Sequence, residues 1–258
     1  MTSEAKAHPI IIAVCGKGGV GKTSISAMIT KIVSRNPSKK ILSIDADPAI
    51  GLATSLGFQA DRTVDDIRND LIKRVTEGLS GDHQEIVTQL DYEVFEAIRE
   101  RKNIAFLAIG RPETDGCYCQ VNHILKDIIA SVAESFDYVI IDGEAGIEQV
   151  NRRVMEKVTH LVLVSDGSLK GLNVVAAIKE VAGQTIQFEK AGLLLNRLRN
   201  QGELAKLSLP PTLDIIGWLP EDERIRTCDI QGESLLDMPE GETEAALKKA
   251  LEALGVPI

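Results

Sequence analysis

Short apolar runs alternate with segments of helical periodicity along most of the chain. Seven of the runs have the length and composition of buried strands, namely Pro9–Cys15, Lys40–Ile44, Ile104–Ile109, Tyr138–Ile141, Leu161–Val164, Ala191–Leu195 and Leu213–Trp218. Helical patterns lie between or after them, for example at Lys22–Ser34, Val121–Ala133, Leu172–Val181 and Thr243–Leu254. Strands that are apolar throughout and separated by helices are typical of a parallel sheet. We therefore expect an α/β fold with about seven mostly parallel strands and helices on both faces.

The segment from Asp61 to Arg101 departs from this alternation. It carries two amphipathic helical patterns, around Ile67–Leu79 and Ile86–Ile98, between the second and third predicted strands. No Pro- or Ser-rich linker and no internal repeat marks a domain boundary. The pattern therefore predicts one domain over residues 1–258, with a helical insertion at about 61–101.

Composition and charge narrow the possible partners. The 258 residues are 44% apolar and only 3% aromatic, and the formal net charge is -9. An acidic chain without a dense Lys/Arg cluster argues against a nucleic-acid-binding face. The start, Met1–Pro9, is too polar for a signal peptide, and no apolar run approaches the roughly 20 residues that span a bilayer. We expect a soluble cytoplasmic protein without a membrane or nucleic-acid partner.

Gly16 to Thr23 fits the phosphate-binding pattern G-x-x-x-x-G-K-[ST] in full, between a predicted strand and a predicted helix. Glycines allow a tight turn whose backbone approaches phosphate oxygens, and N–H groups of the loop and of the helix N-terminus face the anion. Lys22 is expected to reach the β- and γ-phosphates, and Thr23 to give a hydroxyl ligand to Mg²⁺. The motif therefore predicts a site for ATP or ADP with Mg²⁺.

Three aspartates follow predicted strands. Asp45 and Asp47 end the second one, and Asp142 ends Tyr138–Ile141. Ligands of open α/β sheets bind beyond the carboxyl ends of the strands, so all three are expected near the nucleotide. Asp142 has the position of a Walker B aspartate that supports Mg²⁺. An Asp-Pro turn after Asp47 and a plain strand end at Asp142 are the alternatives.

A Cys-x-Cys pair, Cys117 and Cys119, lies in a predicted loop at about 113–120. Residues two apart in an extended segment face the same way, so both sulfurs could bind one ion. Two thiolates fill half of a tetrahedral soft-metal site, and the same pair from a second subunit would complete it. The pair therefore predicts Ni²⁺ or Zn²⁺ shared across a homodimer. Two small buried residues or a redox-active thiol pair are the alternatives.

Two further residues could take part in metal binding or packing. His123 is either a further ligand or a surface residue, and Cys15 is expected in the core.

The loop Gly-Lys-Gly-Gly-Val-Gly-Lys-Thr resembles the deviant Walker A loop of the MinD, ParA, ArsA and nitrogenase iron-protein class. The resemblance implies that Lys17 acts across a dimer interface on the other subunit's nucleotide. It implies that Asp47 orients the attacking water and that Asp45 holds Mg²⁺ through water. It also implies that Asn196 contacts adenine, although a plain strand-to-turn asparagine is the alternative. The implied nucleotide site consists of Gly16, Lys17, Gly18, Gly19, Val20, Gly21, Lys22, Thr23, Ser24, Gly146 and Asn196.

Three further segments resemble the CooC group, the maturation ATPases of nickel-containing carbon monoxide dehydrogenase, with related members for acetyl-CoA synthase. They are Gly116–Cys119, Asp142–Glu148 with Arg152 and Arg153, and Ser165–Asp166 followed by Leu169–Leu172. The resemblance implies an Mg-dependent ATPase that dimerises and supports nickel insertion into a client enzyme. A MinD- or ParA-like spatial-organising ATPase is one alternative. A reductase similar to the nitrogenase iron protein, with Cys117 and Cys119 on an iron–sulfur cluster, is the other.

Overall fold

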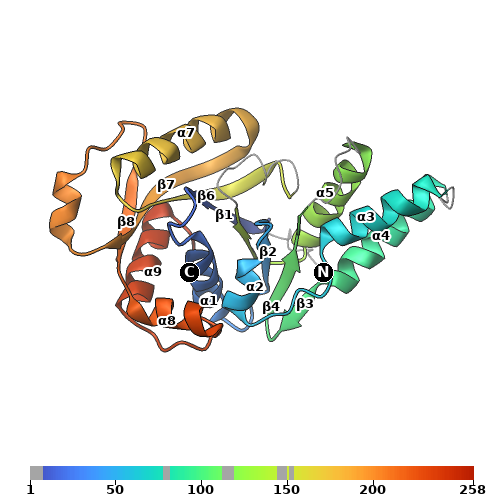
Figure 1. Cartoon of the computed structure of the whole chain (residues 1–258), viewed down its shortest axis with the longest axis horizontal. Coiled ribbons are helices and arrows are strands. Elements are labelled where there is room, and N and C mark those ends of the chain that lie inside the picture. The colour runs from blue at the N-terminus through green and yellow to red at the C-terminus, as the bar shows by residue number, and fades with distance from the viewer. Residues whose placement is uncertain (1–7, 78–81, 112–118, 144–149, 151–153) are drawn as a thin grey trace, which may run out of the picture.

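The computed structural model describes residues 8–77, 82–111, 119–143, 150 and 154–258. Within these ranges the chain forms one sheet with the strand order β3-β4-β2-β5-β1-β6-β7-β8 (Figure 1). The strands are β1 Ile10–Gly16, β2 Ile41–Asp45, β3 Arg99–Arg101, β4 Ile104–Ala108, β5 Tyr138–Asp142, β6 Lys157–Ser165, β7 Gln187–Leu198 and β8 Ile215–Pro220. All neighbours are parallel except β3 and β4. The predicted α/β fold is confirmed.

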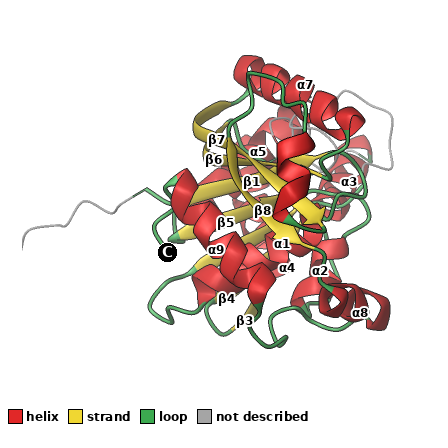
Figure 2. Cartoon of the chain, turned by 90° about the vertical axis from the view of Figure 1, so that its left-hand side faces the viewer, coloured by secondary structure: helices red, strands yellow, loops and turns green. Residues whose placement is uncertain are grey.

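Helices cover both faces of this sheet (Figure 2). They are α1 Lys22–Ser34, α2 Gly51–Leu56, α3 Val64–Thr76, α4 His83–Ala97, α5 Cys119–Ala133, α7 Leu169–Thr185, α8 Glu223–Gln231 and α9 Glu242–Leu254, with a 3-10 helix at Gln201–Lys206. Two larger apolar clusters lie on opposite faces because successive residues of a strand point to opposite sides. In β1, Ala13 and Cys15 join the cluster with α3, α4, α5 and α7, whereas Ile12 and Val14 join the cluster with α1 and α9.

The strand order places the carboxyl ends of seven parallel strands along one edge of the sheet. β1 lies between β5 and β6. The strands from β2 to β5 lie on one side of β1, and the strands from β6 to β8 lie on its other side. Such a reversal leaves a crevice at the carboxyl ends, where ligands of open α/β sheets bind. The loop after β1 opens onto this crevice, together with the ends of β2 and β5. The fold therefore brings Gly16–Thr23, Asp45 and Asp142 to the same edge.

The elements differ from their predicted bounds mainly where polar residues take part. β6 and β7 begin at Lys157 and Gln187, earlier than their apolar runs, because half-exposed polar residues continue the pairing between them. α3 and α4 lie where the amphipathic patterns predict helices. β3 was not predicted, because Arg99–Arg101 is charged and pairs only at the edge of the sheet. Among the described residues, no helix has both the length and the apolar character needed to cross a lipid bilayer.

Candidate functional site

A glycine-rich turn joins β1 to α1 and fits closely against the neighbouring strands. A Cβ atom at Gly16 would lie 2.2 Å from the carbonyl oxygen of Val164 on β6. Gly21 caps α1 with a left-handed φ of 90°, and a Cβ there would lie 2.6 Å from Nδ2 of Asn196. Glycine is therefore required at both positions, by close backbone approach at the first and by both conformation and space at the second.

The first turn of α1 provides the groups that a phosphate needs. Lys22 begins the helix, and its Nζ donates a hydrogen bond to the carbonyl oxygen of Lys17 at 3.4 Å. No acidic residue lies in this turn to oppose an anion. The N–H groups of a helix N-terminus carry partial positive charge and attract phosphate. Lys22, Thr23 and Ser24 therefore form one side of a site that suits a phosphorylated ligand.

Asp45 holds the segment that follows β2. Its Oδ1 accepts a hydrogen bond from the Asp47 N–H at 3.1 Å, and its Oδ2 accepts one from the Leu52 N–H at 2.8 Å. The carboxylate is fully buried. Asp45 therefore fixes the loop that carries Asp47 and the start of α2. A contact of Asp45 with Mg²⁺ through water stays a prediction.

Asp142 ends β5 directly beside Asp45 in the register of the parallel pair. Its Oδ1 accepts a hydrogen bond from the Ser26 hydroxyl of α1 at 3.1 Å. Its Oδ2 is buried and has no hydrogen-bond partner within the described part of the chain. A buried carboxylate oxygen without a partner is costly, and a bound cation or its water would satisfy it. This arrangement fits a magnesium ion next to Thr23.

Burial shifts the titration of both carboxyl groups. The pKa of Asp45 is raised to about 7, first by burial and then by the charge of Asp142. The pKa of Asp142 is raised to about 6 by burial, against the opposing influence of the Thr23 and Ser26 hydroxyls and the Lys22 ammonium. Two adjacent buried carboxylates are stabilised in their charged form by a divalent cation. The electrostatics therefore match a metal site of the Walker B type.

A cavity of about 460 Å³ lies over the glycine-rich turn. Asp47 lines it opposite the loop, and the Asp47 Oδ1 accepts a hydrogen bond from the Ala49 N–H at 2.9 Å. The lining residues are Gly18, Gly19, Gly21, Lys22, Thr23, Ser24, Asp47, Gly51, Ser55, Arg197 and Asp229. A carboxylate and a lysine that face one cavity can hold a phosphoryl group and a water molecule for attack on it. The structure thus brings Lys22, Thr23 and Asp47 together.

A second cavity of about 450 Å³ continues from the first, between the end of β7 and α8. Asn196 lines it, but the Asn196 amide also binds the glycine-rich turn. Its Nδ2 donates to the Val20 carbonyl oxygen at 2.8 Å, and its Oδ1 accepts from the Arg197 N–H at 3.0 Å. Ile25 and Met28 of α1 add apolar surface to the same cavity. Its place next to the phosphate cavity suits the base of a nucleotide, and the predicted contact of Asn196 with adenine stays a prediction.

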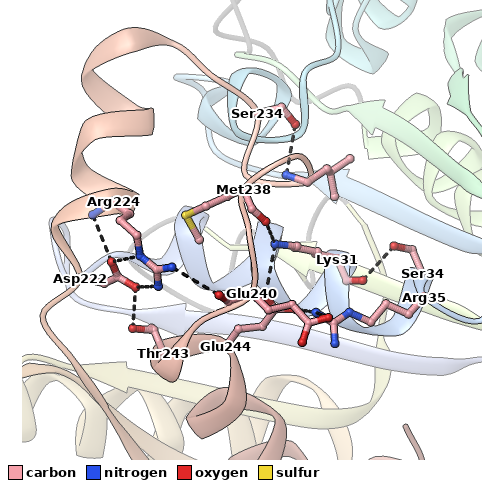
Figure 3. Close-up of polar contacts among 11 residues, drawn as sticks. Lys31, Ser34, Arg35, Asp222, Arg224, Ser234, Met238, Glu240, Thr243 and Glu244 are labelled. Atoms are coloured by element: carbon pink, nitrogen blue, oxygen red, sulfur yellow. Dashed lines mark hydrogen bonds and ion pairs between the residues drawn. The ribbon is translucent and has the colours of Figure 1, made fainter.

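Helix α8 forms the outer wall of this second cavity. Figure 3 shows the contacts by which Asp222 holds the start of this helix. Its carboxylate caps the helix by accepting from the Arg224 N–H at 3.1 Å. It also accepts from Nη2 of Arg224 at 2.6 Å and from the Thr243 hydroxyl of α9 at 2.9 Å. The guanidinium of Arg224 lies against Gly241, where a Cβ would come within 1.9 Å of Nη2. These contacts fix the start of α8 relative to α9.

A buried ion pair ties α9 to α1 (Figure 3). Nζ of Lys31 lies 3.2 Å from Oε2 of Glu244, with side-chain exposures of 9% and 4%. Lys31 also donates to the Met238 carbonyl oxygen, and Arg35 forms ion pairs with Glu244 and Glu240. The helix that begins at Lys22 therefore also anchors the segment after α8 and the start of α9.

Several predicted site residues lie outside the described part of the chain. They are Cys117 and Gly146. Cys119 begins α5, but the structure does not describe its side chain. Among the described residues, no group of three or more His, Cys, Asp or Glu side chains is placed to hold a metal ion. His123 is largely exposed, with Nε2 3.7 Å from Oδ2 of Asp127. The Cys117 and Cys119 metal site therefore stays a prediction. Cys15 is buried, as expected, and burial raises its pKa to about 12.

Three features of the site were not predicted from the sequence. Ser26 was overlooked because its bond to Asp142 spans 116 residues. Arg197 was not among the predicted site residues, although it lines both cavities. Helix α8 could have been found, because Asp222 is a good N-cap residue two positions after Pro220, the last residue of β8.

Comparisons with known proteins agree with this geometry. A family model described as an AAA domain matches residues 9–188. An uncharacterised ATP-binding protein of Methanocaldococcus jannaschii is 36% identical over 240 residues, covering 90% of this chain and 92% of the relative. The carbon monoxide dehydrogenase accessory protein CooC of Rhodospirillum rubrum is 27% identical over 237 residues, covering 88% and 89%.

Solved structures share the fold. The septum site-determining protein MinD of Pyrococcus horikoshii, complexed with Mg-ADP, superposes with a TM-score of 0.64 at 20% identity, covering 95% of each chain. Sheet order, glycine-rich turn and family match point to the same class of protein. The chain belongs to the family described as an AAA domain, and it has the fold of the P-loop protein MinD.

Proposed function

We propose that this P-loop ATPase is a metal-delivery protein that hydrolyses ATP as a homodimer and supports nickel insertion into carbon monoxide dehydrogenase or acetyl-CoA synthase. The observation that carries the ATPase part is the cavity shared by Lys22, Thr23 and Asp47, next to the buried pair Asp45 and Asp142. The likeness to the CooC protein over 88% of this chain, together with the Cys117-x-Cys119 pair, supports the metal-delivery part.

The residues of the cavity divide the work of ATP hydrolysis. The glycine-rich turn and Lys22 bind the β- and γ-phosphates, and the N–H near Gly146 adds a contact to the γ-phosphate. Thr23, Asp142 and, through water, Asp45 would hold Mg²⁺. The ion would neutralise charge on the phosphates. Asp47 orients the attacking water in line with the bond that breaks, which yields ADP and phosphate. Asn196 and the cavity beside α8 hold the adenosine.

Lys17 completes the site of the other subunit. In the single chain its side chain is half-buried. The pKa of Asp166 is lowered mainly by a hydrogen bond from Ser168, and the charge of Lys17 adds to this effect. On dimerisation its ammonium would stabilise the charge that develops on the phosphoryl group of the opposite nucleotide. Hydrolysis then requires two chains, and this requirement links catalysis to assembly.

The transported ion is bound between the two subunits. Cys117 and Cys119 from each chain offer four thiolates, which is the number that a tetrahedral Ni²⁺ or Zn²⁺ site uses. ATP draws the subunits together, hydrolysis relaxes their interface, and the ion passes to a nickel enzyme that lacks its metal. Nucleotide and metal then change each other's affinity by the same factor.

A spatial-organising role is the second candidate, and the likeness of the fold to MinD favours it. The two proposals differ in what they require of the cysteines. Anaerobically purified protein loaded with Ni²⁺ should show a thiolate-to-metal absorption band that is lost in a Cys117→Ser, Cys119→Ser variant. Absence of any metal-dependent band in the wild type would favour the spatial-organising role, and a broad iron–sulfur spectrum in the metal-free preparation would favour a reductase.

A further inference from the structure

Arg197 lies where the phosphate cavity and the second cavity meet. Four residues line both, and they are Gly21, Ser24, Arg197 and Asp229. A nucleotide that places its base beside Asn196 and its terminal phosphates beside Lys22 must pass this junction. The part of the nucleotide at the junction is the diphosphate and the ribose next to it. Lys22 and Arg197 are the two cationic residues that line the phosphate cavity within the described part of the chain.

The backbone at Arg197 is built to turn its side chain toward the glycine-rich loop. The regular pairing of β7 with β8 is interrupted between Leu195 and Leu198. Arg197 takes a left-handed φ of 61°, which is uncommon for a residue with a Cβ. Asn196 stabilises the turn, because its side-chain oxygen accepts the Arg197 N–H at 3.0 Å. A strained conformation at a cavity wall indicates that the position of this side chain matters.

The guanidinium rests on the glycine-rich loop and keeps most of its donors available. Its Nη1 donates to the Gly19 carbonyl oxygen at 3.1 Å. A Cβ at Gly21 would lie 3.7 Å from Nη2 and 3.9 Å from Nε. Within the described residues no carboxylate forms an ion pair with Arg197. A guanidinium offers five donors in a planar fork that matches two phosphate oxygens. A charged fork held beside a phosphate-binding loop therefore lacks the anion that it suits.

We propose that Arg197 binds the α- and β-phosphates of ATP and ADP within its own subunit, which rests on the proposed ATPase function. These phosphates are present before and after hydrolysis, so Arg197 binds substrate, transition state and product alike. Uniform binding lowers KM and the dissociation constant of ADP without raising kcat. Arg197 thus sets how tightly nucleotide is retained, whereas Asp47 and Lys17 act on the rate of the chemical step.

The test compares Mg-ADP affinity and steady-state kinetics of full-length variants. Arg197→Gln removes the charge, and Arg197→Gly also removes the strain of the left-handed backbone. Both should weaken Mg-ADP binding by about 10- to 100-fold, the range for hydrogen bonds to a charged group, and raise KM for ATP by a similar factor. The kcat at saturating ATP should stay within about threefold of the wild type. Arg197→Lys should recover part of the affinity, because it keeps the charge.

Arg199→Gln is the matched control, because Arg199 is an exposed arginine two residues along that lines neither cavity. It should bind Mg-ADP as the wild type does. Mg-ADP affinity of Arg197→Gln within twofold of the wild type would overturn the inference, and so would a loss of kcat with an unchanged KM. A complete lack of recovery in Arg197→Lys would also overturn it, because the loop contact alone would then explain the loss. Failure of the wild type to bind Mg-ADP would overturn the proposed function itself.

Discussion

Asp45 and Asp142 lie directly opposite each other on the parallel strands β2 and β5, and both carboxyl groups are buried. Burial raises the pKa of Asp45 to about 7 and that of Asp142 to about 6. In the unfolded chain both groups titrate near their ordinary values of about 4. The folded protein therefore holds more protons than the unfolded chain between about pH 4 and pH 7. A bound divalent cation would remove this difference by stabilising the charged form.

The first prediction concerns the pH dependence of stability without nucleotide or metal. Because the folded pKa values are raised, stability contributed by the protonated pair is present at low pH and is lost as pH rises through about 6 to 7. Urea unfolding of the wild type should show this decline between about pH 4 and pH 7, and stability should level off above that range. Asp142→Asn keeps the acceptor for Ser26, removes one charge and should show a clearly smaller decline.

Asp91→Asn serves as the control, because Asp91 is exposed on α4 and the substitution removes the same charge. Its unfolding midpoint should follow the wild-type pH profile. Equal slopes in Asp142→Asn and the wild type would contradict the account of a strained carboxyl pair. With saturating Mg-ADP, the gain in stability should be larger at pH 8 than at pH 6, because binding requires both carboxylates in their charged form.

The second prediction separates nucleotide binding from hydrolysis. Lys22→Ala should lose nucleotide binding, because the charge of the phosphates is no longer compensated. Asp47→Ala should bind Mg-ATP but hydrolyse it at least about 100-fold more slowly, since only the positioning of water is lost. Phosphate release and binding of a fluorescent ATP analogue measure the two effects. Wild-type turnover in Asp47→Ala would show that another group positions the water.

The third prediction tests whether Lys17 acts on the other subunit. Lys17→Ala alone should bind nucleotide and fail to hydrolyse it. A mixture with Lys22→Ala should regain part of the activity, because the intact loop of the first variant then receives the Lys17 of the second. Activity of each variant alone provides the baseline. No recovery in a mixture with demonstrated mixed dimers would place the action of Lys17 within its own chain.

The fourth prediction concerns the contacts of Asp222 with Arg224 and Thr243, which hold the start of α8 against α9 and are called the clasp below. Gly241→Ala should displace the Arg224 guanidinium and weaken its pair with Asp222, since the added Cβ would lie 1.9 Å from Nη2. We expect a loss of about 1 kcal/mol in the free energy of unfolding, because the Arg224 side chain is partly exposed and water screens its pair with Asp222. ADP should bind more weakly as the wall formed by α8 shifts.

Gly183→Ala is the matched control for this clasp. Gly183 lies in α7, and no atom comes within 4 Å of an added Cβ. Alanine in a helix interior should raise stability by up to about 1 kcal/mol and leave ADP affinity unchanged. Urea unfolding and calorimetric titration measure both quantities. Unaltered stability and ADP affinity in Gly241→Ala would show that the clasp does not hold the cavity wall.

The parts of the site that depend on local sequence could be predicted. Gly16–Thr23 is a contiguous motif, and Asp142 ends an apolar strand, so their neighbourhood follows from the parallel sheet. That Asp45 also holds the segment after β2 could not be predicted, because its carboxylate accepts the N–H of Leu52 seven residues later. The place of Arg197 depends on an irregular strand end and a left-handed backbone. Neither leaves a periodic signal in the sequence.

The polar contacts around α8 were beyond prediction for a related reason. Asp222 binds Thr243, 21 residues away, and the Lys31 and Glu244 pair joins α1 to α9. A charged residue on a helical pattern is ordinarily solvated, so sequence alone gave no ground for burying Lys31. Only the packing of α9 against α1 brings these side chains together.

The central feature of the proposed function is a metal ion shared by two chains. Metal content and solution mass should be measured for the wild type and for the Cys117→Ser, Cys119→Ser double variant, with and without a nonhydrolysable ATP analogue. We predict one tightly bound Ni²⁺ or Zn²⁺ per two wild-type chains and loss of the ion in the double variant. The metal affinity of the wild type should decrease as the pH is lowered, because the thiolates must stay deprotonated. Tight metal binding that is unchanged in the double variant, or one ion per single chain without bridging, would contradict the shared site.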